Sequence, residues 1–142
     1  HLPCSKISRL STLTKAKTAK SSAVTASYDL AHRASSLALS KKAEKITILD
    51  VRKLTMITDF YVICSGRSDT HVKTIHDAVS DGLMPEEKPW HVEGLDNLGW
   101  VLMDYVNAVI HIFQPDQRDF YSLERLWADG KSEVVEDHIT AD

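Results

Sequence analysis

The sequence predicts a mixed α/β fold (α+β) in which helices cover one mixed β-sheet. Stretches rich in β-branched and aromatic residues, which are typical of strands, alternate with stretches whose apolar residues recur at helical spacing. The chain has 142 residues, a length that suits one domain with a single substantial core. We therefore expect the strands to share one sheet and the helices to pack on its faces.

Charge divides the chain into three parts. Lys and Arg number 17 and Asp and Glu number 20, which gives a formal net charge of -3 and argues against wholesale wrapping by nucleic acid. The first acidic residue is Asp29, and acidic residues dominate after Gly130. We expect a basic disordered arm at 1–27, a folded domain at 28–129 and an acidic tail at 130–142. The arm could be a solvated extension, the remainder of an organellar transit peptide or a nucleic-acid contact.

The first half of the domain reads as helix, strand, strand, helix. An amphipathic pattern predicts a helix from Tyr28 to about Ala43, with Ser27 as its N-cap. Residues 46–51 and 59–66 are typical of strands, and the helix after Gly66 can be capped by Ser68 or Asp69. The turn between them matches neither the Walker nor the dinucleotide glycine pattern, so a tight structural turn is favoured over an anion site.

The second half reads as three strands and a helix. Residues 90–94 form a short predicted strand, and 100–105 with 109–113 predict an antiparallel hairpin. Phe120, Leu123 and Trp127 then recur at helical spacing, which predicts one helix packed back on the hairpin. Asp104 and His111 interrupt otherwise apolar strands, so each is expected to face water or a partner.

Two classes of function fit these polar residues. Metal-dependent nucleotide transfer would need acids such as Asp50, Asp59 and Asp104 to meet, classically with a DxD pair after a Gly-Ser turn. GRSD has its glycine and serine in the wrong frame for that turn, and no DxD occurs in the chain. A protein-binding surface instead needs an aromatic anchor and a charge, which Trp100 and Asp104 could supply. The scattered His residues lack zinc-motif spacing, Cys4 and Cys64 form no disulfide framework, and no apolar run reaches the ~18 residues of a membrane span.

Several motifs in order identify a resemblance. The chain resembles the ribosomal silencing factor (Iojap) family over about residues 28 to 129. The resemblance rests on KKAEKITILDVR, TDFYVICSGRSDTHV, HVEG, WVLMDYVNAVIHIFQ and RDFYSLERLW. It implies a fold related to the nucleotidyltransferases without their catalytic acids, hence no enzyme activity, no cofactor and no metal.

The resemblance also implies a partner and a surface. Family members bind the large ribosomal subunit through ribosomal protein uL-fourteen and sterically block joining of the small subunit, which represses translation. Carried over to this chain, the partner-binding residues are Trp100, Val101, Leu102, Met103, Asp104, Tyr105, Asn107, Phe113, Arg118 and Tyr121. Trp100 and Asp104 are the expected direct contacts, and strand alternation makes some of the others support.

Three further expectations accompany the resemblance. Val106 stands where many members have glycine, so the hairpin turn is expected to be looser than a tight turn with positive φ. A bacterial cytoplasm is the first choice of location, with a mitochondrion or plastid as the alternative. The basic arm could add minor rRNA contacts, and the sequence leaves open whether the free protein forms a homodimer.

Overall fold

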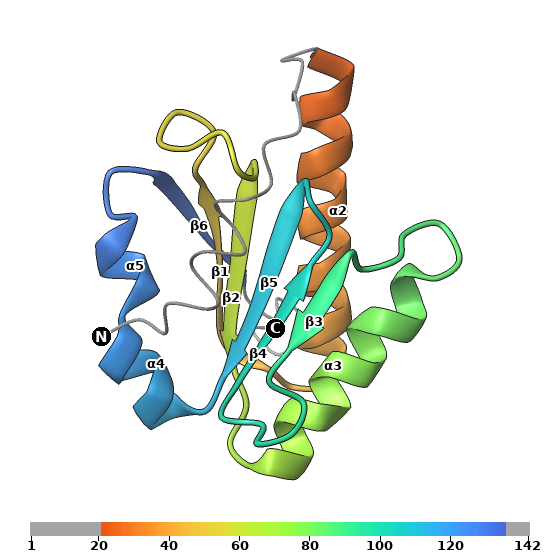
Figure 1. Ribbon diagram of the computed structural model, residues 1–142, viewed down its shortest axis with the longest axis vertical. Helices are drawn as coiled ribbons and strands as arrows, with labels where there is room; N and C mark the ends of the chain where they lie inside the picture. The colour runs from red at the N-terminus through yellow and green to blue at the C-terminus, as the bar shows by residue number, and fades with distance from the viewer. Residues whose placement is uncertain (1–20, 136–142) are drawn as a thin grey trace, which may run out of the picture.

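The computed structural model describes residues 21–135, with side chains from Ala26 onward. They form a six-stranded sheet of order β3-β4-β5-β2-β1-β6, with helices on both faces (Figure 1). The elements are α2 (Ser21–Ser40), β1 (Glu44–Asp50), β2 (Phe60–Ser65), α3 (Asp69–Leu83), β3 (His91–Glu93), β4 (Trp100–Asp104), β5 (Ala108–Phe113), α4 (Pro115–Tyr121), α5 (Leu123–Leu126) and β6 (Lys131–Val135).

The sheet is mixed, which confirms the predicted fold class. The central strands β2 and β5 pair in parallel, and every other neighbouring pair is antiparallel. All residues of β2, β4 and β5 are buried. The predicted central position of the near-continuous apolar strand β2 is therefore confirmed, because such a strand needs cover on both faces.

Two helical layers cover the two faces of the sheet. The helices α2 and α3 lie on one face, and the shorter α4 and α5 lie on the other, at the left of Figure 1. Alternation along β4 sends Val101 and Met103 into the core under α2 and α3, and sends Trp100 and Leu102 into the second core with Leu123 of α5. Within the described residues, no helix is long and apolar enough to span a membrane.

The first helix begins earlier than expected. It starts at Ser21, so seven residues assigned to the arm are helical, and the remaining arm residues 1–20 lie outside the described part of the chain. Ser27 is 1% exposed inside the helix, so its predicted role as N-cap is wrong. At the next helix, Ser68 is the cap, because its hydroxyl accepts a hydrogen bond of 3.1 Å from the His71 amide.

The domain also extends beyond residue 129. Lys131–Val135 pairs antiparallel with β1 as an edge strand, so this part of the acidic segment belongs to the sheet; residues 136–142 lie outside the described part. The Tyr28 hydroxyl of α2 donates a hydrogen bond of 2.7 Å to Glu133. One acidic side chain of the segment thus ties its strand to the first helix.

The single helix predicted after the hairpin is two short helices. Ser122 separates α4 from α5 with φ 48, in the left-handed region. This break changes the direction of the side chains that follow it. Leu123, after the break, is buried, whereas Phe120, which precedes the break and was predicted to pack on the hairpin, is 66% exposed.

Candidate protein-binding hairpin

The hairpin of β4 and β5 holds eight of the ten predicted binding residues. Trp100 pairs with Phe113 at one end of the hairpin, and Asp104 pairs with Val109 next to the turn. Four residue steps separate the two ends of β4, which is about 13 Å along an extended strand. Trp100 and Asp104 therefore lie at opposite ends of the strand.

The Trp100 side chain is part of the core, so its expected exposure is wrong. The residue is 4% exposed, and its ring stacks on Phe113 at 4.8 Å and lies 4.7 Å from Tyr121 of α4. Its indole Nε1 donates a hydrogen bond of 3.0 Å to Nδ1 of His111 on the neighbouring strand. Because indole N–H only donates, this ring nitrogen of His111 must accept and carries no proton.

The hydrogen bond from Trp100 explains why the polar residue His111 lies in an apolar strand. Its ring also meets Tyr61 edge-on, with centroids 5.2 Å apart. His111, which interrupts an apolar strand, accepts a hydrogen bond from the indole N–H of buried Trp100. This agrees with the rule that buried polar groups are hydrogen-bonded. Sequence reasoning missed this pair because β-sheet register decides which residues face each other.

Asp104 is buried as well, against expectation, at 1% exposed. Its Oδ1 accepts a hydrogen bond of 2.8 Å from the Val106 amide, while Oδ2 has no hydrogen-bond partner within the described residues. Burial raises the pKa of the carboxyl, and the Val106 hydrogen bond and His91 on β3 partly offset that rise. This side chain fixes the start of the hairpin turn.

The turn itself is tight. Val106 has φ 72, and the Asn107 amide donates to the Tyr105 carbonyl at 2.8 Å across a three-residue turn. The prediction of a looser turn is therefore wrong: valine keeps the positive φ that glycine would adopt freely, and the Asp104 carboxylate helps hold it there.

The predicted site residues do not form one exposed patch. Val101, Leu102, Met103, Tyr105 and Phe113 are all buried. Of the ten, Asn107 at the tip of the turn is exposed and Tyr121 is partly exposed. Trp100, Phe113 and Tyr121 lie together at the end of the hairpin distant from Asn107.

Arg118 lies on α4, three residues before Tyr121. It is 7% exposed, and its Nε donates to Glu124 Oε2 at 2.9 Å and its Nη1 to the Ser65 hydroxyl at 2.9 Å, while Nη2 also contacts Glu124 at 2.5 Å. One guanidinium thus joins α4, α5 and β2. Sequence reasoning missed Ser65 and Glu124 as its partners, since no motif spacing relates either residue to Arg118.

The acids considered for metal-dependent transfer, Asp50, Asp59 and Asp104, do not form a metal-binding group within the described residues, although Asp59 acts electrostatically on Arg52, the partner of Asp50. Asp104 lies beside the β4–β5 turn, whereas Gly66 follows the opposite end of the sheet, next to Phe113. Asp50 is on β1, with β2 and β5 between it and β4, and it forms an ion pair of 2.6 Å with Arg52. In the described part of the chain, no three His, Cys, Asp or Glu side chains are placed to share a metal ion.

Known proteins share the sequence pattern of this domain. The sequence model of the RsfS family, "Ribosomal silencing factor during starvation", matches residues 24–142. The ribosomal silencing factor RsfS of Bacillus subtilis is 38% identical over 93 residues, which cover 63% of this chain and 77% of that protein. The chloroplastic protein Iojap of Zea mays is 33% identical over 91 residues, covering 63% of this chain and 39% of its own length.

A solved structure shows the same architecture. The crystal structure of a Chromobacterium violaceum protein superposes with a TM-score of 0.70 at 27% identity, covering 78% of this chain and 92% of that one.

Proposed function

This chain belongs to the ribosomal silencing factor family, and we propose from that premise that it binds the large ribosomal subunit and represses translation by blocking the small subunit. The family match over residues 24–142 is the observation that carries the proposal. It is supported by the fold, which resembles a solved structure over most of both chains. The relatives are named as silencing factors rather than enzymes, and we propose no catalytic activity.

The proposed partner on the subunit is ribosomal protein uL-fourteen, and the proposed surface is the β4–β5 hairpin. Asn107 on the hairpin turn and Tyr121 on the adjacent α4 are the predicted site residues that are not buried, so we assign direct contact to them. The other eight support the surface: Asp104 fixes the turn that carries Asn107, and Trp100 supports the ring of Tyr121. Buried residues act on a partner through the side chains that they position.

Co-sedimentation with large subunits tests the surface. Asn107→Arg places a bulky charge at the exposed tip of the turn, so we expect the variant to stay folded and to lose co-sedimentation. Thr74→Arg is the matched control, because Thr74 is also exposed but lies on α3. Equal sedimentation of Asn107→Arg and the control would reject the hairpin as the contact surface.

A subunit-joining assay tests the activity. Purified large and small subunits are mixed with and without the protein and separated on a sucrose gradient. We expect the joined-particle peak to decrease as protein is added, with the large subunit carrying the protein. An unchanged joined-particle peak at saturating protein would reject steric silencing even if binding were intact.

The location and the assembly state complete the proposal. We place the protein on ribosomes in a bacterial cytoplasm, with a mitochondrion or plastid as the alternative, since its relatives include bacterial and chloroplastic proteins. Minor rRNA contact is assigned to the basic arm, residues 1–20 of which lie outside the described part of the chain. A homodimer is the form to test for the free protein, by light scattering across protein concentrations.

A further inference from the structure

A polar cavity lies where the two parallel strands end. β2 ends at Ser65 and β5 at Phe113, side by side in register. After β2 the chain passes to α3 on one face of the sheet, and after β5 it passes to α4 on the other (Figure 1). In open α/β sheets, ligands bind in the crevice that such a divergence leaves beyond the carboxyl ends of the strands. A cavity of about 420 Å³ occupies this position.

The floor of the cavity is rigidly built. Buried Arg118 is held by Glu124 and by the Ser65 hydroxyl, so its charge is matched and its position fixed. Two lining residues, Lys45 with φ 51 and Ser122 with φ 48, adopt the left-handed region without being glycine. Such strained conformations concentrate at ligand-binding sites, where the surrounding structure holds them.

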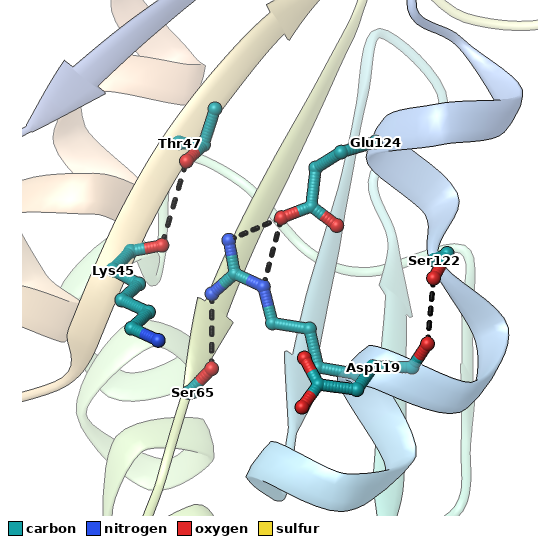
Figure 2. Close-up of polar contacts among 7 residues, drawn as sticks. Lys45, Thr47, Ser65, Asp119, Ser122 and Glu124 are labelled. Atoms are coloured by element: carbon teal, nitrogen blue, oxygen red, sulfur yellow. Dashed lines mark hydrogen bonds and ion pairs between the residues drawn. The ribbon is translucent and has the colours of Figure 1, made fainter.

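Three charged side chains that line the cavity are exposed and could contact a ligand. Glu44, which also lines the cavity, is paired with Arg67 outside it. Lys45 and Arg125 line the cavity and form no ion pair within the described residues, and both have exposed atoms. Figure 2 shows Lys45 extending from β1 and Glu124 from α5 around the space beside Ser65. Asp119 adds one exposed carboxylate.

We propose that this cavity binds a single nucleotide, with Lys45 and Arg125 on the phosphate and Asp119 on the ribose hydroxyls. Its volume falls within the ~300–1,000 Å³ of small-ligand sites. Cations recognise phosphate, and a carboxylate at such a site accepts hydrogen bonds from ribose hydroxyls. The nucleotide comes from RNA or from the free pool, and the site binds it without a chemical step. The cavity lies at the end of β2 and β5 that is distant from the Asn107 turn, whereas its lining residues Asp119 and Ser122 precede and follow Tyr121 on α4. The site is therefore separate from the Asn107 part of the proposed uL-fourteen contact and adjoins the Tyr121 part.

Titration followed by NMR tests the site on the full chain. The probes are guanosine monophosphate, its 2′,3′-dideoxy analogue, inorganic phosphate and a short oligouridylate, each added to millimolar concentration. We expect saturable shifts of the Ser65 and Ser122 amides and tighter binding of the ribonucleotide than of its dideoxy analogue. Saturation by the mononucleotide identifies the free pool as the source, and saturation by the oligouridylate alone identifies RNA.

A charge-matched pair of variants decides the outcome. The double variant Lys45→Gln/Arg125→Gln loses both proposed phosphate contacts. It should therefore bind the saturating probe about tenfold more weakly, or weaker still. Lys53→Gln with Lys88→Gln removes two positive charges elsewhere on the surface and should leave binding unchanged. The proposal is overturned if no probe saturates, if both double variants bind alike, or if inorganic phosphate binds as tightly as every nucleotide.

Discussion

Val106 occupies a backbone conformation that β-branched residues rarely adopt. Its φ of 72 places it at the centre of a three-residue turn, a conformation that costs on the order of 1–3 kcal/mol for a non-glycine residue. Val106→Gly should therefore raise the free energy of unfolding by about 1 kcal/mol, after the entropic cost of glycine is subtracted. Urea denaturation measures the change.

A control separates strain from the general effect of glycine. Val134 lies in the edge strand β6, is 64% exposed and does not have a positive φ. Val134→Gly should lower the free energy of unfolding, because glycine weakens a strand interior. If Val106→Gly lowers it as well, the turn is not strained by the valine.

Asp104 makes stability depend on pH. Because its folded-state pKa is raised by burial, the native state holds the proton more tightly than the unfolded state. The free energy of unfolding should therefore fall as pH rises from the unfolded pKa near 3.8 through the folded pKa, and stay lower above it. Asp104→Asn should remove that decrease, as measured by urea denaturation at a series of pH values.

The difference between the wild-type protein and the Asp104→Asn variant is the informative quantity, because other groups titrate equally in both. His91, opposite Asp104 on β3, favours the charged carboxylate and limits the size of the effect. A difference in unfolding free energy that stays constant with pH would show that Asp104 titrates alike in the folded and unfolded states. Asp104→Arg, by contrast, would bury a large cation and is expected to unfold the hairpin.

At the scale of elements, Arg118 joins three segments that are separate in sequence. Its guanidinium donates hydrogen bonds to Ser65 at the end of β2 and to Glu124 of the short helix α5. Arg118→Lys keeps the charge but cannot reproduce the fork of donors, so it should lower the free energy of unfolding by about 2 kcal/mol. Thermal and urea denaturation measure the loss.

The neighbouring arginine provides the comparison. Arg125 is exposed on the adjacent α5 and forms no ion pair within the described residues, so Arg125→Lys should change stability by less than about 0.5 kcal/mol. Equal losses for the two variants would show that the Arg118 bonds contribute little beyond charge.

At the scale of the whole molecule, burial predicts a gradient of local stability across the sheet. The central parallel pair β2 and β5 is buried throughout, whereas the edge strands β3 and β6 are partly or mainly exposed. Amide hydrogen exchange should therefore be slowest in the central pair and fastest in the edge strands. Protection of β6 equal to that of β2 would show that the strand after residue 130 is locked into the global unfolding unit.

The sequence determined the class of fold and its inner strands by composition. FYVICS is apolar at every position but the last and therefore had to lie inside a sheet covered on both faces, as β2 does. The position of Ser68 and Asp69 between a strand and an amphipathic stretch predicted the start of α3, and the structure selects Ser68 as the N-cap. The ordered motifs also pointed to the family that the comparisons show. Each of these conclusions depends on neighbours along the chain.

Only the tertiary structure decided which side chains the molecule exposes. Alternation shows that Trp100 and Val101 face opposite sides of β4, but not that α4 covers the Trp100 side, because that depends on where the chain goes after β5. The bond from Trp100 to His111 and the contact of Arg118 with Ser65 likewise join residues 11 and 53 positions apart. Long-range register sets such pairs, and a single sequence records composition and local spacing but not register.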